Sequence, residues 1–192
     1  MLPFSRPAVF YLTSSTPSPL TYDQEITPKH SLNIHDLDGK GKEWIIQATV
    51  SKISIYNSKN FKLRLKNRII TSTIDIFQSF NIEISIETQL GTLQLDPTLN
   101  SVSIHYKDSS LVGKIVLSPG KTPIGFKNLK FKVGEEQAFI LADKEGNLFD
   151  PQDQSSSEVI GDQEQWVLSY EEEEGGWKLD GLKRGAMNYP VL

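Results

Sequence analysis

Charged and apolar side chains alternate strictly over residues 61–69 of this chain. The even positions hold four cations: Lys62, Arg64, Lys66 and Arg68. The odd positions include four apolar residues: Phe61, Leu63, Leu65 and Ile69. Successive side chains of a strand point to opposite faces, so residues two apart share a face about 6.6 Å from each other. The stretch therefore predicts a β-strand with one apolar face toward a core and one cationic face.

Similar short alternating runs continue along the chain and predict its fold class. They cover residues 44–56, 73–77, 81–88, 101–107, 111–117 and 124–133, and Gly, Pro, Asn, Asp and Ser separate them. No stretch shows the 3.6-residue period of an amphipathic helix, and no internal repeat is evident. Alternation with one polar face is typical of antiparallel sheets. We therefore expect an all-β, mainly antiparallel protein, a β-sandwich or barrel.

The chain divides into four segments by composition. Residues 1–30 hold five of the ten prolines and are expected to form an extended arm, because proline lacks a backbone donor. Residues 31–149 carry the strand signals and form the predicted sandwich or barrel core. Residues 150–164 form a polar linker loop. Residues 165–192 are expected to form a C-terminal aromatic hairpin and tail packed on the core, with Trp166 and Trp177 on its two strands.

The middle of the chain also resembles a known β-sandwich family. Residues 96–100, 102–107, 112–113 and 117–119 resemble the central strands of late-embryogenesis-abundant type β-sandwiches. The resemblance implies a sandwich fold for that part, and no site residue, cofactor or partner is carried over from it.

Charge and residue usage limit the classes of function. Residues 40–144 carry 15 Lys and Arg against 9 Asp and Glu, whereas residues 145–192 carry 3 against 11. Such asymmetry is typical of chains with charged partners. The chain has no cysteine, which excludes disulfides, thiolate metal sites and a thiol nucleophile. No apolar run is long enough to span a membrane, so we expect a cytoplasmic or other intracellular protein.

Sequence motifs for metals, phosphates and catalysis fail on inspection. A calcium loop beginning at Asp36 would place Lys40 at a ligand position, and a cation there repels the ion. The Gly-Lys-Thr at residues 120–122 lacks the earlier glycine of a phosphate loop, and Pro123 opposes the helix that should follow. The histidines His30, His35 and His105 show no metal-ligand spacing. We therefore predict no catalytic residue, no cofactor and no metal, and no enzyme activity.

The cations of residues 62–68 are the candidate site, and two interpretations stay open. In the first, an anion or partner binds a face built from the following residues: Lys62, Arg64, Lys66, Arg68, Lys130 and Lys132. In the second, Glu83 and Glu87 alternate at the same period on the next strand and pair with these cations. The pairing is favoured, because no exposed aromatic lies between the cations to stack on bases.

The sequence favours a non-catalytic protein-interaction or structural module, a subunit or adaptor in a larger assembly. Its expected partners are proteins, which would pair with the arm and the unpaired sheet edges by β-augmentation. One alternative is a β-barrel that binds an apolar small molecule. Another is binding of nucleic acid or another polyanion through the basic strand.

Overall fold

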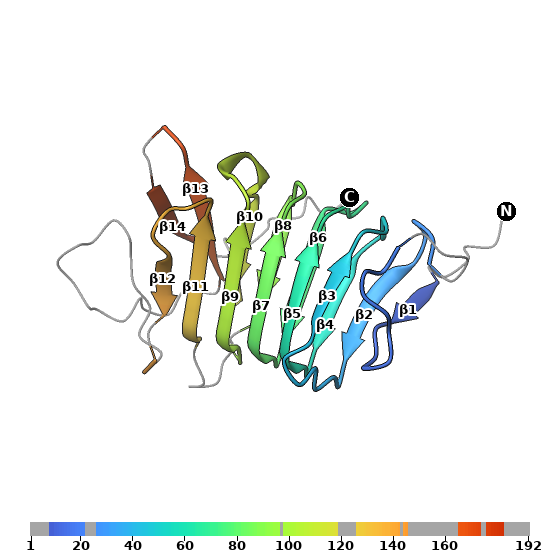
Figure 1. The fold of residues 1–192 in the computed structure, drawn as a ribbon. Helices are drawn as coiled ribbons and strands as arrows, with labels where there is room; N and C mark the ends of the chain where they lie inside the picture. The colour runs from blue at the N-terminus through green and yellow to red at the C-terminus, as the bar shows by residue number, and fades with distance from the viewer. Residues whose placement is uncertain are drawn as a thin grey trace, which may run out of the picture.

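The structure is a computed structural model that describes residues 8–21, 26–96, 98–118, 126–142, 144–145, 165–173 and 176–182. Its described elements are β-strands and one short 3₁₀ turn, Ser109–Leu111, which confirms the all-β class. The strands form two facing sheets, and Figure 1 shows the chain advancing steadily along the molecule from blue to red. The protein is a β-solenoid of about five turns.

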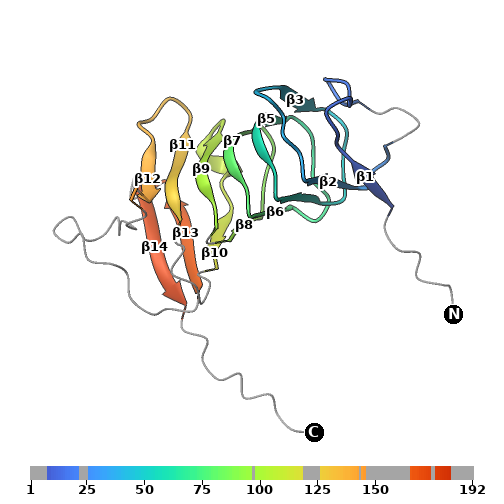
Figure 2. The same ribbon diagram turned by 90° about the horizontal axis from the view of Figure 1, so that it is seen from below.

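Each sheet collects strands from successive turns of the solenoid. The first sheet, called sheet A, contains in spatial order β1 (Val9–Tyr11), β2 (Ser31–His35), β4 (Ile53–Tyr56), β6 (Thr73–Phe77), β8 (Thr92–Leu95), β10 (Lys114–Leu117), β13 (Gln165–Glu171) and β14 (Gly176–Leu182). The second, sheet B, contains β12 (Phe139–Ala142), β11 (Lys127–Val133), β9 (Asn100–Tyr106), β7 (Phe80–Ile86), β5 (Lys59–Leu65) and β3 (Glu43–Ile46). Figure 2 shows the chain crossing from one sheet to the other in every turn.

The expectation of a mainly antiparallel sandwich or barrel is wrong. All pairings from β1 to β10 in sheet A, and from β3 to β11 in sheet B, are parallel. Neither sheet closes on itself, and the resemblance to sandwich strands does not describe this topology. The error has a physical reason. Parallel sheets are usually covered by helices on both faces, so strands with one polar face suggest an antiparallel sheet. In a solenoid, the outer face of a parallel sheet stays in contact with water.

A repeat of about 21 residues underlies the solenoid, so the expectation of no internal repeat is also wrong. Leu32, Ile53 and Ile74 stack in register, each 21 residues after the last. On sheet B, Ile84 pairs with Ile104 after 20 residues, and Ile104 pairs with Phe131 after 27. The changing loop lengths at the later turns hide the period in the sequence.

The core lies between the sheets and consists of apolar rows that run along the solenoid. Every second residue of the central strands is almost fully buried, and the inward positions are mostly Ile and Leu. One row of sheet B contains Trp44, Leu63, Ile84, Ile104 and Phe131. These rows fill the space between the sheets with side chains. The alternative of an apolar-ligand barrel therefore loses its structural basis, since there is no barrel.

Close backbone approach at one corner requires glycine. At Gly113, a Cβ would lie 2.0 Å from the carbonyl oxygen of Leu90, a backbone atom of the preceding turn. Such a contact is far inside van der Waals distance, and a backbone atom cannot move aside without shifting the turn. Gly113 therefore fixes how closely the β8 and β10 turns stack.

The N-terminal segment covers the first turn of the solenoid. Leu20 bridges to Ile46 beside β3, and the indole nitrogen of Trp44 donates a hydrogen bond of 3.0 Å to the Thr16 carbonyl. Leu12 and Leu20 are buried against the core. The described part of the segment expected to be an arm thus lies on the body of the protein. It closes the open end of the hydrophobic core, which a solenoid requires.

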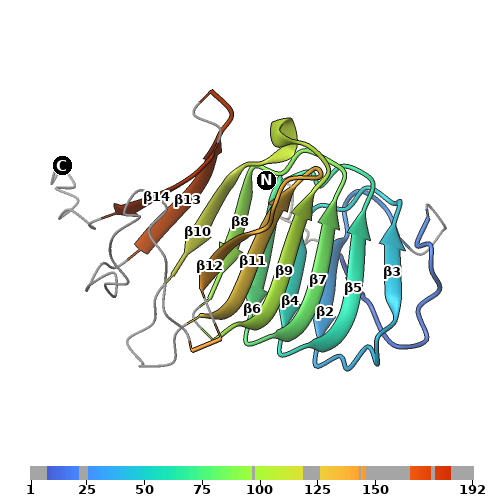
Figure 3. The same ribbon diagram turned by 60° about the vertical axis from the view of Figure 1, so that its left-hand side comes forward.

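Antiparallel strands cover the other end. β12 pairs antiparallel with β11, and the hairpin β13–β14 extends sheet A beyond β10, as Figure 3 shows. The hairpin packs through Trp177, whose ring centre lies 5.6 Å from Phe131, 5.8 Å from Phe139 and 5.2 Å from Tyr170. The predicted linker at residues 150–164 lies outside the described residues.

Candidate functional site

The cations predicted from the alternation divide between a strand and the loop after it. Lys62 and Arg64 lie on the outer face of β5, while Lys66 and Arg68 follow its end and are exposed. The Lys62 ammonium lies 2.7 Å from the Glu83 carboxylate. Arg64 contacts Glu43 at 3.1 Å through its terminal nitrogen, and its Nε lies 4.0 Å from Glu87. Carboxylates on β3 and β7, and just after β7, therefore partner Lys62 and Arg64.

Parallel register explains this pairing. Lys62 stands opposite Glu83 in the β5–β7 ladder and opposite Glu43 in the β3–β5 ladder. The hydrogen bond and charge of Glu83 raise the pKa of Lys62 above its ordinary value. The other two predicted cations, Lys130 and Lys132, lie on β11, beyond β7 and β9. The six cations do not form one continuous cationic face.

A second feature of sheet B is a row of residues in the left-handed backbone conformation, one at the start of each turn. Five positions align across the strands: Gly41 with φ 82°, Asn60 with 57°, Asn81 with 53°, Ser101 with 54° and Asn128 with 52°. The register of the flanking residues places them side by side, because Phe61, Ile82, Val102 and Leu129 stack directly after them. We call these five residues the polar row.

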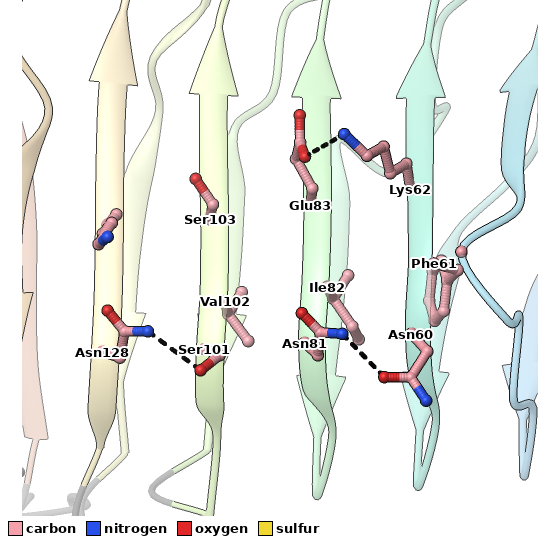
Figure 4. A pocket seen from close by; sticks show the side chains of 12 residues that line it. Asn60, Phe61, Lys62, Asn81, Ile82, Glu83, Ser101, Val102, Ser103 and Asn128 are labelled. Carbon is pink, nitrogen blue, oxygen red and sulfur yellow. Dashed lines mark hydrogen bonds and ion pairs between the residues drawn. The ribbon is translucent and has the colours of Figure 1, made fainter. Parts of the chain in front are cut away.

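The side chains of the polar row bond to one another along the solenoid, as Figure 4 shows for two of the contacts. The Asn81 amide donates to the Asn60 carbonyl oxygen at 2.8 Å, and the Asn60 amide donates to Asp38 at 3.1 Å. The Asn128 amide donates to the Ser101 hydroxyl at 3.0 Å. Asparagine tolerates a positive φ better than most residues, so it meets both the backbone and the bonding requirement.

Asp38 ends the polar row beside the first turn. The hydrogen bond from Asn60 and the backbone hydrogen bond from Lys40 lower the pKa of Asp38 below its ordinary value. Asp38 also lies 3.6 Å from Lys59. The acidic stretch that resembled a calcium loop in the sequence thus supplies a carboxylate to the corner of the solenoid.

The polar row lines an open groove on the outer face of sheet B. The groove has a volume of about 360 Å³ and crosses β5, β7, β9 and β11. Beside the row, it is lined by Lys62, Glu83, Ser103 and Lys130. Figure 4 also labels Phe61, Ile82 and Val102, which line the groove beside the polar residues and whose side chains are buried in the core. The groove lining is rich in amides and hydroxyls, and it carries an ion pair and a further cation.

A second groove of about 300 Å³ lies farther along the same face. It is lined by Arg64, Ser85, Glu87, His105 and Lys107, among others. His105 Nε2 lies 3.0 Å from the Gly134 carbonyl oxygen, and the backbone of the loop after β11 therefore holds the ring.

The outer face of sheet A has a different chemistry. Three rings on β1, β2 and β4 touch edge to face: His35 lies 6.0 Å from Tyr11 and 5.8 Å from Tyr56. Tyr11 is 58% exposed and Tyr56 41%. Nearby, Asp75 is buried and ion-paired with Lys52.

Among the residues that the structure describes, no group of three or more His, Asp or Glu side chains is placed to hold a metal ion. The same described residues contain no helix that is long and apolar enough to cross a membrane. Comparison with protein-family models, with curated proteins and with solved structures finds no match to this chain.

Sequence reasoning missed the polar row, although the sequence contains a signal for it. Residues 57–60 are Asn-Ser-Lys-Asn, and residues 78–81, one repeat later, are Gln-Ser-Phe-Asn. Asn60 and Asn81 therefore recur at the 21-residue spacing of the solenoid. The strand interpretation concentrated on the cations that follow and left these amides unassigned.

Proposed function

We propose that this chain is a non-catalytic binding module that holds an extended partner in the groove over the polar row. The observation that carries the proposal is the register of that row, which aligns amide and hydroxyl groups on four adjacent strands. A rigid parallel sheet holds such groups at fixed spacing and direction, so little conformational entropy is lost when a partner binds.

The non-catalytic part of the proposal rests on the nature of the groups in the groove. Amides and hydroxyls recognise polar partners but are weak acids and bases near neutral pH. The ionisable pair between β5 and β7, Lys62 and Glu83, is exposed and engaged in a salt bridge. Neither the amides and hydroxyls nor the salt-bridged pair is suited to proton transfer in catalysis, which requires a group with a pKa near the operating pH.

Polyanion binding through the basic strand is the weaker alternative. A polyanion would have to compete with Glu83 for Lys62 and with Glu43 for Arg64. Each contact to a phosphate would then leave a carboxylate without its partner beside the bound anion. We therefore do not assign the groove to nucleic acid.

The test compares wild-type protein with two bulky variants on opposite faces. Ser103→Trp places an indole in the groove, and Thr73→Trp places one on the outer face of sheet A. Both are screened against a displayed library of extended peptides and an array of soluble glycans. The proposal is supported if a peptide or glycan binds the wild type and Thr73→Trp but not Ser103→Trp. It is overturned if Ser103→Trp still binds every ligand that the wild type binds.

A further inference from the structure

We propose that the groove over the polar row binds a linear, neutral glycan that lies across the strands of sheet B. This inference rests on the proposed function and names its ligand class. Three properties of the groove support a glycan: its chemistry, its spacing and a gap in its hydrogen bonds.

The chemistry of the row matches hydroxyl groups. Each Asn side chain offers two N–H donors and a carbonyl acceptor, and each Ser hydroxyl both donates and accepts. One N–H of each of Asn60, Asn81 and Asn128 is used in the bonds described above, and the second N–H and the carbonyl lone pairs can bond to a sugar hydroxyl, which both donates and accepts. A phosphate only accepts and would favour unpaired cations. Of the two cations that line the groove, Lys62 is paired with Glu83, and Lys130 lies on β11, the last strand that the groove crosses.

The spacing of the row matches a glycan better than a peptide. Neighbouring strands lie about 4.8 Å apart, so the polar groups of the row recur at that interval along the solenoid. A pyranose unit in a linear chain advances by a similar length, which allows one sugar per strand. An extended peptide presents side chains of one face only about every 6.6 Å, and it loses register after two strands. The four strands of the groove therefore accommodate about four sugar units.

The row contains a gap where a ligand hydroxyl fits. Asn81 bonds to Asn60, and Asn128 bonds to Ser101, but among the described contacts no hydrogen bond joins Asn81 to Ser101. The gap lies between β7 and β9, in the middle of the groove. Figure 4 shows the two side chains on neighbouring strands with no dashed line between them. The Ser101 hydroxyl donates to the Asn100 side-chain oxygen at 3.2 Å, so a ligand hydroxyl placed in the gap would donate to Ser101 Oγ and accept from the second N–H of the Asn81 amide.

The experiment measures binding of neutral linear oligosaccharides to the whole chain. The probes are cellopentaose, mannopentaose and laminaripentaose, with the matching trisaccharides. Binding is measured by titration calorimetry and by NMR shifts of the backbone amides. The test variant is Asn60→Gly/Asn81→Gly, which removes two amides and keeps a residue suited to a positive φ. The matched control is Asn33→Ala, which removes an amide from the outer face of sheet A.

We expect at least one pentasaccharide to bind about tenfold more tightly than the matching trisaccharide and to shift the NMR signals of backbone amides in β5, β7, β9 and β11. Asn60→Gly/Asn81→Gly should weaken that binding at least tenfold, while Asn33→Ala should leave it unchanged. Pentasaccharides that shift no groove amide, or that bind the double variant equally well, would overturn the glycan assignment.

The peptide arm of the earlier screen separates this failure from failure of the proposed function. If library peptides bind the groove and lose binding in Ser103→Trp while no pentasaccharide binds, the proposed function stands and the glycan assignment falls. If neither class of probe contacts the groove, both proposals fall.

Discussion

In two successive repeats of this solenoid, two polar positions that lie two residues apart differ in burial and in their bonding. Ser58 and Ser79 are buried at the corner, and their hydroxyls bind backbone: Ser79 Oγ accepts from the Ser58 N–H at 3.1 Å, and Ser58 Oγ accepts from the Leu37 N–H at 3.1 Å. Asn60 and Asn81 lie outside and bond through their side chains. The serine hydroxyls complete the backbone of the corner, whereas the exposed amides are the groups to which the proposed function assigns recognition.

Removal of a buried serine should produce the largest effect on stability. In Ser79→Ala the buried N–H of Ser58 loses its acceptor. An unsatisfied buried donor costs about 1–3 kcal/mol, so the free energy of unfolding should fall by that amount, as measured by urea denaturation. Ser85→Ala, on the outer face of β7, is the control and should change stability little. Equal losses in the two variants would contradict the structural role of the buried serines.

Tyr106 sharpens the comparison because it is a buried polar group without the partners that the serines have. Its hydroxyl lies in the core and has no hydrogen-bond partner among the described residues, and burial raises the pKa of Tyr106 above the ordinary value of 10.0. The pKa of Tyr106 is higher in the folded protein than in the unfolded chain, so below about pH 10 ionisation of this residue costs no stability. As the pH rises further, the unfolded chain ionises first, and the free energy of unfolding falls by about 1.4 kcal/mol per pH unit.

Tyr106→Phe should therefore be as stable as the wild type or more stable at pH 8. It should also lose less stability between pH 10 and 11. Urea denaturation of both proteins at pH 8, 10 and 11 measures the difference. Curves that remain parallel over this range would show that Tyr106 ionises as freely in the folded protein as in the unfolded one.

Substitutions in the exposed row should lower the free energy of unfolding less than Ser79→Ala does, and the size of the loss should depend on the backbone conformation. Asn81 has a φ of 53°, where alanine is disfavoured by about 1 kcal/mol and glycine is not. We expect Asn81→Ala to lower the free energy of unfolding by about that amount, and Asn81→Gly to lower it less. Chemical denaturation of the two variants tests this order. If glycine were the more damaging replacement, side-chain bonds rather than backbone strain would hold the exposed row in place.

The sequence predicted local features well and long-range pairing poorly. Strict alternation identified β5 and its two faces, because the two-residue period follows from the strand itself. The sequence also favoured pairing of these cations with Glu83 and Glu87 without fixing a register, and in the structure Glu83 lies opposite Lys62. Alternation does not reveal whether the next strand is parallel or antiparallel, since both arrangements bury every second residue. The choice depends on where the corners send the chain, and so the solenoid was missed.

The polar row was missed for a related reason. A positive φ at Asn60 or Asn81 follows from stacking of one turn on the next and has no alternation pattern of its own. Only the 21-residue recurrence of Asn and Ser carries that information, and it is clear in two turns before loop lengths change. The connection from β9 to β11, which includes β10, is six residues longer than the regular spacing, and this conceals the match of Asn128 to the row.

The smallest effect is expected for the ion pair beside the row. Lys62 and Glu83 lie 2.7 Å apart, yet their side chains remain 53% and 48% exposed. Water and salt screen such pairs, so Lys62→Met should change the free energy of unfolding far less than Ser79→Ala does. The measurement is urea denaturation at low and high salt, with Lys66→Met as the control for loss of an exposed lysine that follows β5. A loss in Lys62→Met comparable to that of Ser79→Ala would show that the outer face of sheet B also holds the fold together. The separation of stability from recognition would then not hold.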